Sequence, residues 1–482
     1  MALTRKEFDV LSTLATSPDD ARAQAASPEL DELRSMGLVS GTALTELGRK
    51  ALEPYRVENA VIMAAGLSSR FVPVSYWRPK GLTSVRGEVL IERQIRQLHE
   101  AGVTDITVVV GYRADEFAYL AEKYGVRLVT NDLYAERNNN WTLWLVRDQL
   151  RNTYICSSDD YFAQNPFETY VYRAYYSAVY MDGSTDEWCL GVDENDRITS
   201  VTVGGKDAWA MLGHVYFDRA FSNTFVRILE SIVRSPFYEE KYADELWETI
   251  FARNPDCLSM DIRRYPAGQV LEFDSVDELM EFDPSFLTKV ECPALDNIVD
   301  VLGCERTQLH GFYPIKNGLT NLTFHFAVGA EEYVYRHPGV GTEKFINRAA
   351  EKDADTVAHE LGIDRTFVYE DAEKGWKISH FVPNAKNVDP LDSSEVARAM
   401  QLARTFHESG ARIDATFDFY RDGLGYERLL KSHGNINIPG YDELCEKVTH
   451  LNEYCTADEG FSACFCHNDY LPLNFLIGED GS

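Results

Sequence analysis

The chain has 482 residues, of which 45% are hydrophobic and 26% are charged, a composition typical of globular proteins. This length exceeds one ordinary domain and predicts roughly two to four. The formal net charge of -30 argues against broad contact with the phosphates of a nucleic acid, although it leaves room for a local basic pocket.

Cysteine usage and hydrophobicity bear on the cellular compartment. The nine cysteines are scattered and include no C-x-x-C pair, so reduced thiols fit better than a structural zinc site. The N-terminal stretch MALTRKEFDV lacks an apolar segment, and no part of the chain approaches the ~18 apolar residues of a membrane span. We therefore expect a cytoplasmic protein with no membrane contact.

Residues 1–54 are predicted to form a small unit of their own. KEFDVLSTLA has helical periodicity, SPELDELRSMGLV is a capped helix leading into a strand, and ALTELGRKALEPY returns from strand to helix. This order resembles a winged helix-turn-helix. Asp19 and Asp20 lie where a DNA-reading helix would be basic, so we favour a structural or regulatory remnant over a DNA reader.

Residues 55–285 alternate strand-like and helix-like segments. Strands are predicted at NAVIMAA, DITVVVGY, VRLVTN and TYICSSDDYF, and helices at VLIERQIRQLHEAG, ADEFAYLAEKYG and WTLWLVRDQL. Repeated strand–helix units predict an α/β fold with a mostly parallel sheet and helices on both faces. Ligands of such sheets bind beyond the carboxyl ends of the strands.

Residues 286–482 have a different pattern. DPSFLTKVECPALDNIVDVLGC is predicted to be a helical connector. GFYPIKNGLTNLTFHFAVGAEEYVYRHPG predicts antiparallel hairpins with glycine turns, and NRAAEKDADTVAHELG predicts a helix that precedes the strands RTFVYED and GWKISHFV. From Ser393 onward the chain is predicted to be mainly helical.

A small-residue loop follows the first strand of residues 55–285, in VIMAAGLSSRFVPVSYWRPKGL. Ala65 and Gly66 allow a ligand to approach the backbone closely, and backbone amides at such a junction can bind phosphates. Ser69 adds a donor, and Arg70 and Lys80 add positive charge. Because G-x-x-S-R alone is common in turns, the preceding strand and the following Pro-Lys-Gly carry most of this prediction.

Two separated acidic stretches are candidate magnesium ligands. Asp159 or Asp160 ends a predicted strand in ICSSDDYF, and Asp274 follows the strand-like QVLEF. Carboxylates beside a phosphate loop are well placed to hold Mg²⁺. The alternative for each acid is a helix cap, and Asp274 could cap SVDELMEF. The acids form one metal site only if the fold brings them together.

Two tryptophans stand beside acidic pairs, Trp188 in STDEWCL and Trp247 in YADELWETI. Aromatic faces with carboxylates suit a quaternary ammonium group, which has no hydrogen-bond donor. Packing in the core is the alternative for each tryptophan.

Several stretches together carry a family resemblance: MAAGLSSRF, RPKGL, VVVGY, EKYGVRLVTNDLYAERNN, SSDDYF, DEW and EFDSVDEL. They resemble the bacterial Lic-type CTP:phosphocholine cytidylyltransferases, within the sugar-nucleotidyltransferase superfamily, over about residues 56–285. The resemblance implies a Rossmann-like nucleotidyltransferase domain with a mixed, mostly parallel sheet. It also implies transfer of a cytidylyl group from CTP to phosphocholine with Mg²⁺, which supplies activated choline for bacterial surface glycans.

The resemblance assigns roles to residues at the phosphate loop and metal site. Gly66, Ser69 and Arg70 would bind the CTP phosphates, and Lys80 would neutralise charge at the α-phosphate. Asp159 and Asp274 would hold the metal, although Ser157 replaces the first acid of the family's D-x-D pattern.

The resemblance also assigns the two substrate pockets. Asn138 and Asn139 would lie at the cytosine and ribose. Trp188 and Trp247 would form the choline pocket, with Glu187 or Asp186 as the counter-charge.

Two other functions remain open. A nucleotidyltransferase of this type could instead take phosphoethanolamine, 2-aminoethylphosphonate or a sugar phosphate. A regulator that joins a winged helix to a ligand-sensing domain is the alternative from a different class, and the scarcity of basic residues near the N-terminus argues against it.

A second resemblance begins near residue 308. NGLTNLTFHF, YVYRHPGVGTEKFINRAAE, GWKISHFVPNA, LARTFHESG and HNDYLPLN resemble choline/ethanolamine kinases of the aminoglycoside-phosphotransferase-like group. The resemblance implies a partial protein-kinase-like (α+β) domain over residues 286–482 that would phosphorylate choline with ATP.

Roles in this kinase-like part follow from the same resemblance. Gly318, Thr320 and Asn321 would form the loop over ATP, and Arg336 would replace the usual strand lysine and pair with Glu351. Asp469 would act as the catalytic base, and Asn474 would be a Mg²⁺ ligand. The family continues into a strand with an I-D-W-E type motif, whereas this sequence ends at Ser482. We therefore expect an incomplete kinase site, with truncation favoured over a non-catalytic lobe.

Overall fold

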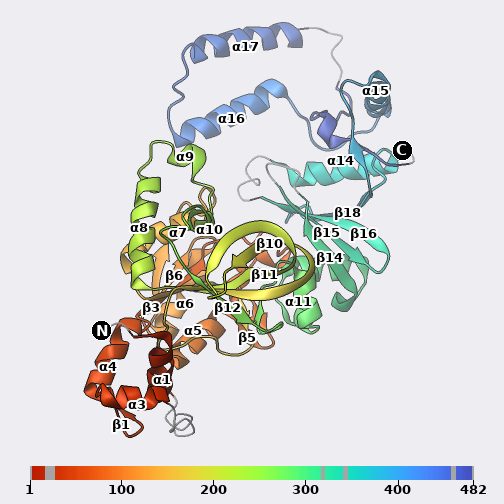
Figure 1. Cartoon of the computed structure of the whole chain (residues 1–482). Helices are drawn as coiled ribbons and strands as arrows, with labels where there is room; N and C mark the ends of the chain where they lie inside the picture. The colour runs from red at the N-terminus through yellow and green to blue at the C-terminus, as the bar shows by residue number, and fades with distance from the viewer. Residues whose placement is uncertain (1–2, 17–27, 316–320, 340–345, 458–462, 480–482) are drawn as a thin grey trace. The chain divides into compact units, whose positions relative to one another are not determined.

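The computed structural model describes residues 3–16, 28–315, 321–339, 346–457 and 463–479, and Figure 1 labels the helices and strands. The chain forms two compact units, Met1–Asn297 and Ile298–Ser482. The boundary expected after residue 285 falls within the first unit, because Phe286 and Leu287 are buried and the Phe286 ring lies 6.2 Å from that of Phe71.

The N-terminal part of the first unit contains helices and a short hairpin: α1 (Arg5–Thr16), α3 (Pro28–Ser35), β1 (Val39–Ser40), β2 (Ala43–Leu44) and α4 (Glu46–Leu52). Leucines from the three helices fill a small core of their own. Tyr55 stacks on Tyr172 of the region that follows, with ring centres 5.6 Å apart. The winged-helix resemblance stays a prediction, and Asp19 and Asp20 lie outside the described residues.

A seven-stranded sheet forms the centre of the first unit, with strand order β12-β10-β11-β8-β3-β6-β7. Neighbouring strands are parallel in the pairs β3–β6, β3–β8, β6–β7 and β10–β12, and antiparallel in β8–β11 and β10–β11. The predicted mixed, mostly parallel Rossmann-like sheet is therefore confirmed. The strand bounds are β3 (Asn59–Ala64), β6 (Ile106–Val110), β7 (Arg127–Thr130), β8 (Thr153–Ser157), β10 (Tyr175–Val192), β11 (Ile198–Phe217) and β12 (Asp261–Tyr265).

Helices cover both faces of this sheet because its central strands send alternate side chains into two cores. Ile62 of β3 packs with α5 (Leu90–Glu100), whereas Val61 packs on the side of α7 (Asn139–Leu145), α8 (Arg219–Val233) and α10 (Trp247–Arg253). The remaining elements of this unit are α6 (Tyr119–Tyr124), α9 (Tyr238–Lys241), α11 (Val276–Phe282), α12 (Phe286–Lys289), β4 (Ser84–Val85), β5 (Glu88–Val89), β9 (Tyr161–Phe162) and β13 (Val270–Leu271).

The long hairpin of β10 and β11 was not expected from the sequence. Only the beginning of β10, from Tyr175 to Val179, also pairs with β12. Beyond that point the two strands continue as a two-stranded arm, which Figure 1 shows as a wide yellow arc. The segment STDEWCL, and Trp188 with it, lies on this arm.

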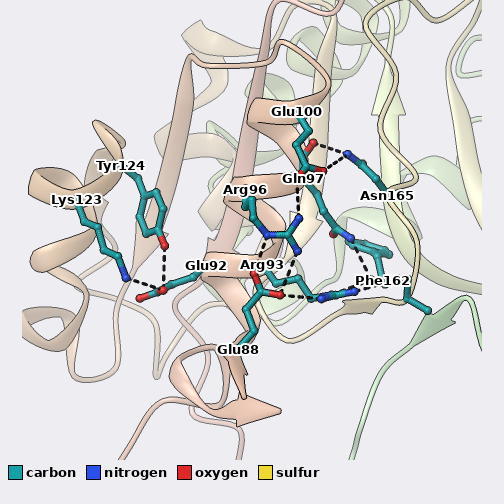
Figure 2. Close-up of polar contacts among 11 residues, drawn as sticks. Glu88, Glu92, Arg93, Arg96, Gln97, Glu100, Lys123, Tyr124, Phe162 and Asn165 are labelled. Carbon is teal, nitrogen blue, oxygen red and sulfur yellow. Dashed lines mark hydrogen bonds and ion pairs between the residues drawn. The ribbon is translucent and has the colours of Figure 1, made fainter. Parts of the chain in front are cut away.

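Ion pairs and hydrogen bonds from α5 hold the segment after β8 in place (Figure 2). Arg93 Nε and Gln97 Nε2 both donate to the backbone oxygen of Phe162, at 2.9 and 3.1 Å. The Glu88 carboxylate forms ion pairs with Arg93 at 2.7 Å and with Arg96 at 2.8 Å. These contacts fix β9, and thereby the acidic turn that precedes it.

The second unit begins with a five-stranded antiparallel sheet of order β14-β15-β16-β18-β17. Gly329, at φ 63°, makes the turn between β15 and β16. The expected sequence of hairpins, one helix and two further strands is present. The bounds are β14 (Leu309–Pro314), β15 (Asn321–Val328), β16 (Glu331–Pro338), α14 (Arg348–Glu360), β17 (Phe367–Glu370) and β18 (Lys377–His380).

Helices dominate the rest of the second unit, as predicted. They are α15 (Ser393–Glu408), α16 (Phe419–His433) and α17 (Tyr441–Thr456), and a short ladder joins β19 (Lys386–Asn387) to β20 (Leu476–Ile477). The connecting helix α13 (Pro293–Leu302) crosses from the first unit to the second. Within the described ranges, no helix has the length and apolarity needed to span a membrane.

Candidate active site

The loop after β3 leaves its backbone accessible. Ala65 is buried, and its carbonyl accepts the Tyr112 N–H at 3.1 Å. Gly66, Ser69 and Arg70 are exposed, and a Cβ added at Gly66 would meet no atom within 4 Å. Packing within the chain therefore does not require glycine here, whereas a ligand resting on the backbone would. This arrangement suits the phosphate contact predicted for the loop.

Lys80 and Asp159 form an ion pair, with Nζ and Oδ2 2.8 Å apart, and Lys80 is only 5% exposed. Gly81 permits this approach, because a Cβ there would lie 2.6 Å from Ser158 Oγ. Burial lowers the pKa of Lys80, but the charge and hydrogen bond of Asp159, together with the charges of Glu272 and Asp274, outweigh it and the pKa is raised. Burial raises the pKa of Asp159, but Lys80, with hydrogen bonds from Ser157 and the backbone, outweighs it and that pKa is lowered. Both groups are therefore ionised.

The turn after β8 directs its two aspartates differently. Ser157 Oγ donates to Asp159 Oδ1 at 2.5 Å, and Ser157 N donates to Asp160 Oδ2 at 3.3 Å. Gln94 of α5 donates to the backbone oxygens of Ser157 and Asp160 at 2.7 and 2.9 Å. Asp160 is 1% exposed, and burial raises its pKa well above the usual value. Asp159, which is partly exposed, is therefore the acid that a ligand can reach.

The second predicted metal acid, Asp274, enters the same site through strand pairing. β13 pairs antiparallel with β9, with Leu271 opposite Tyr161. Continuing this register places the residues after β13 beside residues 158–160. Asp274 Oδ2 lies 2.7 Å from Arg70 Nη1, and its charge also raises the pKa of Lys80. The fold thus brings the two acidic stretches together.

The helix-cap alternative for Asp274 is wrong. Ser275 is the N-cap of α11, because its Oγ accepts the Glu278 N–H at 3.2 Å. The Asp274 carboxylate is therefore left for Arg70 and for a ligand.

Glu272 is a site residue that sequence reasoning missed. The residue as a whole is exposed, but burial of its carboxyl group, and then the Asp159 charge, raise the pKa of Glu272 to about 7. Glu187 lies near the same groups. Burial, and then the Asp274 charge, raise the pKa of Glu187, whereas the Arg70 charge lowers it. The sequence signal for Glu272 is its position two residues before Asp274 in VLEFDSV. That position indicates a site residue only once the pairing of β13 with β9 is known.

The donor set fits a divalent cation. Oxygen ligands from carboxylates are those that Mg²⁺ prefers, and the acids here outnumber Lys80 and Arg70. Asp159 and Asp274 remain the predicted ligands. A different group of potential metal ligands lies outside this site, in the second unit. Among the described residues, the ligand atoms of the exposed His407, Cys464 and Cys466 lie within 4.8 Å of one another.

The side chains of Asn138 and Asn139 form hydrogen bonds with residues 244–248 of the same chain. Asn138 Nδ2 donates to the Asp244 carbonyl at 3.1 Å. Asn139 Oδ1 accepts the Trp247 N–H at 2.7 Å, and Asn139 Nδ2 donates to Glu248 Oε2 at 3.1 Å. These bonds use most of the hydrogen-bonding capacity of Asn139. The geometry therefore supports positioning of residues 244–248, and contact with cytosine or ribose stays a prediction.

Trp247 does not line an open pocket, contrary to its predicted role. It is 1% exposed and stacks on Tyr176 with ring centres 5.8 Å apart. The core-packing alternative is the one the structure supports for this residue. Trp188 is half-buried against the same core, and the neighbouring Asp186 and Glu187 are exposed.

The predicted kinase residues fall in two places within the second unit. Arg336 Nη2 lies 2.8 Å from Glu351 Oε1, so the expected partners are together. Asn474 Nδ2 donates to Asp469 Oδ2 at 2.9 Å. Asn321 begins β15, whereas Gly318 and Thr320 lie outside the described residues.

Known proteins share the features of the first unit. Residues 60–138 match the MobA-like NTP transferase domain family, so this unit is a nucleotidyltransferase. The chain is 33% identical over 224 residues to the choline-phosphate cytidylyltransferase of Streptococcus pneumoniae, covering 46% of this chain and 96% of that protein. It is 34% identical over 233 residues to the 2-aminoethylphosphonate cytidylyltransferase of Lancefieldella rimae, covering 48% and 93%. The chain belongs to the bacterial cytidylyltransferase family that contains these two enzymes.

Two solved structures from Streptococcus pneumoniae are also similar. The CTP:phosphocholine cytidylyltransferase is 33% identical, with 48% of this chain and 98% of that chain covered and a TM-score of 0.45. The choline kinase is 25% identical, with 39% of this chain and 64% of that chain covered and a TM-score of 0.33.

Proposed function

We propose that the first unit transfers the cytidylyl group of CTP to phosphocholine in the cytoplasm, giving CDP-choline and pyrophosphate for choline decoration of bacterial surface glycans. The observation that carries this proposal is the convergence of two cations and two acids on the loop after β3. Arg70 and Asp274 meet although 204 positions separate them, and Lys80 and Asp159 meet beside them.

The chemistry needs no covalent enzyme intermediate. A phosphate oxygen of phosphocholine attacks the α-phosphorus of CTP in line, and pyrophosphate leaves. Lys80 and Arg70 neutralise the charge that develops on the phosphates, and the loop amides hold them in position. Asp159 and Asp274 would hold Mg²⁺, which when bound supplies further charge neutralisation.

The two ion pairs indicate how CTP enters. Phosphate oxygens compete with the carboxylates for Arg70 and Lys80, so CTP binding releases Asp274 and Asp159 from their partners. Arg70 is 69% exposed, and an exposed ion pair of this kind is weak. The pair of Arg70 with Asp274 is therefore expected to exchange first.

The headgroup is the finer part of the proposal. Phosphocholine is supported by the name of one relative, and 2-aminoethylphosphonate by the name of another. Both headgroups carry a cation, which fits the excess of acids around the site. A cytidylyltransferase for phosphoethanolamine, 2-aminoethylphosphonate or a sugar phosphate is the alternative.

Pyrophosphate release with CTP tests the proposal directly. Phosphocholine, phosphoethanolamine, 2-aminoethylphosphonate and glucose 1-phosphate should be compared at equal concentration, with and without Mg²⁺. We expect the highest kcat/KM with phosphocholine. A preference for another acceptor would replace the headgroup assignment, and no release with any of them would overturn the proposal.

For the second unit we propose a choline-kinase-like role. The observation that favours it is the ion pair of Arg336 with Glu351, which in kinases orients a phosphate-binding cation. Phosphorylation of choline by ATP should be measured on the full chain. Phosphocholine formation that Arg336→Ala abolishes would support an active kinase, whereas absence of ATP turnover would favour a non-catalytic lobe.

A further inference from the structure

Three potential metal ligands meet in the second unit and belong to neither of the candidate sites described above. The imidazole of His407 and the thiols of Cys464 and Cys466 place their ligand atoms within 4.8 Å of one another. All three residues are exposed, so an ion from solvent reaches them without any opening of the fold. The proposed cytidylyl transfer and the predicted kinase chemistry use none of these three side chains.

Packing of an aromatic pair brings the two cysteines to the histidine. His407 lies in the last turn of α15, and the residue before it, Phe406, is buried. The Phe406 ring centre lies 5.4 Å from that of Phe465, the residue between the two cysteines. Phe465 is half-buried, whereas Cys464 and Cys466 on either side of it are exposed. The aromatic contact therefore holds the C-x-C stretch against the end of α15 and leaves both thiols accessible.

Two hydrogen bonds fasten the ends of the segment that contains these cysteines, residues 463–470. At its start, Arg412 Nη1 donates to the Ala463 carbonyl at 2.9 Å. At its end, the Tyr470 hydroxyl donates to the Ala399 carbonyl in α15. The three ligands are thus held by contacts that do not involve the ligands themselves, so the arrangement does not depend on a bound ion.

The ligand chemistry favours a thiophilic cation over Mg²⁺. Thiolate and imidazole are ligands that Zn²⁺ prefers, whereas Mg²⁺ prefers oxygen. Around a tetrahedral Zn²⁺ with bonds of about 2.0–2.3 Å, ligand atoms lie roughly 3.5–3.8 Å apart, so the three exposed side chains need to close by about 1 Å. The Cys466 thiol donates to the Cys464 carbonyl at 3.3 Å. Because a thiol is a weak donor, this bond is easily given up when the proton leaves and the sulfur binds metal.

From this arrangement we propose that His407, Cys464 and Cys466 bind one Zn²⁺ ion, which links the end of α15 to the segment before the predicted catalytic loop. Each thiol loses its proton to solvent, so two thiolates balance the charge of the ion. Three protein ligands leave the fourth tetrahedral position to water. Binding orders the segment, and with it the approach to Asp469 and Asn474, which bond to each other at 2.9 Å. The histidine is distant in sequence from the cysteines, so no local spacing indicates this site.

Metal titrations of the reduced full chain test the proposal without any substrate. Co²⁺ can replace Zn²⁺ in such sites, and its bonds to sulfur and its tetrahedral geometry give separate absorption bands. We expect one equivalent of Co²⁺ to produce both bands, Zn²⁺ to abolish them, and excess Mg²⁺ to leave them unchanged. His407→Gln, Cys464→Ser and Cys466→Ser should each weaken Zn²⁺ binding about 100-fold or more, since a direct ligand contributes more than the ~10–100-fold of a supporting contact.

Cys455→Ser is the matched control, because Cys455 is an exposed cysteine of α17 in the same unit, and it should bind Zn²⁺ as the wild type does. Hydrogen exchange gives a second readout. Zn²⁺ should slow exchange in residues 463–470 of the wild type but not of His407→Gln, which keeps both cysteines. A Co²⁺ spectrum without sulfur bands, unchanged affinity in all three ligand variants, or an equal loss in Cys455→Ser would overturn the proposal. A reduced chain that binds no metal but forms a Cys464–Cys466 disulfide on mild oxidation would also overturn it and would indicate a redox pair. None of these outcomes depends on transferase or kinase activity.

Discussion

At the scale of single residues, the candidate site consists of charges that depend on one another. Lys80 is almost fully buried and stays charged because Asp159 lies 2.8 Å away. Arg70 Nη1 lies 2.7 Å from Asp274 Oδ2, but the Arg70 side chain is 69% exposed. The buried pair is therefore costly to break, and the exposed pair is free to exchange.

Replacement of Asp159 by Asn should lower kcat/KM about 10²–10³-fold, because it removes a predicted metal ligand and leaves Lys80 without its counter-charge. Pyrophosphate release measures the effect, and circular dichroism checks that the variant is folded. Asp148→Asn is a matched control, since Asp148 is 88% exposed and precedes β8, at the opposite end of that strand from Asp159. Wild-type turnover by Asp159→Asn would reject the metal assignment.

Replacement of Glu248 by Gln should stabilise the protein in a pH-dependent manner. The pKa of Glu248 is about 7 in the folded protein against an ordinary 4.5, so its contribution to stability is full below pH 4.5 and is lost as pH rises through 7. At pH 8 the variant avoids a buried charge and should exceed the wild type by up to about 3 kcal/mol. Urea unfolding at pH 5 and pH 8 measures this, and an equal difference at both pH values would contradict it.

At the scale of elements, three segments hold the acidic turn after β8. Gln94 of α5 binds the backbone of the turn at both ends, and β13 pairs with β9 directly after it. The third segment is the turn of Lys80–Leu82, where Gly81 packs against Ser158. The position of Asp159 is therefore set by contacts from outside its own strand.

Replacement of Gly81 by Ala should displace this third segment. The new Cβ would lie 2.6 Å from Ser158 Oγ and 2.7 Å from its Cβ, which costs about 1–3 kcal/mol and moves Lys80 away from Asp159. Thermal unfolding and pyrophosphate release should both show a loss. Ser158→Gly removes the two atoms in question, so the double variant should regain stability and rate, and an unrescued double variant would contradict this account.

A second element-scale contact joins the start of α7 to the segment before α10. Asn140 is fully buried, donates to the Tyr242 carbonyl at 2.7 Å and accepts the Tyr238 hydroxyl at 3.0 Å. With the bonds of Asn138 and Asn139, this holds residues 238–248 against the start of α7. The segment carries Glu248, whose carboxylate accepts a hydrogen bond from Asn139.

Asn140→Ala should destabilise the first unit by about 2–3 kcal/mol, because it leaves two buried polar groups unpaired. Hydrogen exchange should accelerate first in residues 238–248. Asn223→Ala, exposed on α8, is the control and should change neither quantity. Unchanged exchange in that segment would mean that other contacts hold it.

At the scale of the whole molecule, the chain combines two units, and each candidate site draws its residues from one unit alone. The convergent acids and cations all lie within Met1–Asn297, and Arg336, Glu351, Asp469 and Asn474 lie within Ile298–Ser482. We propose two domains within the first unit, divided near residue 54, whereas the boundary predicted after residue 285 lies inside that unit, which extends to Asn297. The net charge of -30 fits small-molecule substrates better than nucleic acid.

A chain of residues 1–303 should therefore keep cytidylyl transfer. It includes α13, which crosses between the units, and it retains every residue of the candidate site. We expect kcat/KM within about twofold of the full chain, as for independent sites. Loss of activity in a shortened chain that still unfolds cooperatively would show that the second unit contributes to the transferase.

Much of the fold could be predicted because its signals are local. Apolar runs such as NAVIMAA, which becomes β3, and the amphipathic period of α5 record burial directly. The long β10–β11 hairpin could not be predicted, since its arm is neither continuously apolar nor regularly alternating. Trp247 was misassigned because an indole beside an acid has the same sequence pattern in a core as in a binding pocket.

The sequence by itself determined the order of elements, the loop of small residues after β3 and the residue types that nucleotidyl transfer needs, because these depend on neighbours along the chain. Only the tertiary structure decided which residues act together. The register of β13 on β9 placed Asp274 beside Asp159, burial separated Asp159 from Asp160, and the hydrogen bonds of Asn139 joined the start of α7 to the start of α10. These outcomes depend on contacts between segments about 70 to 200 positions apart, and local sequence carries no record of such contacts.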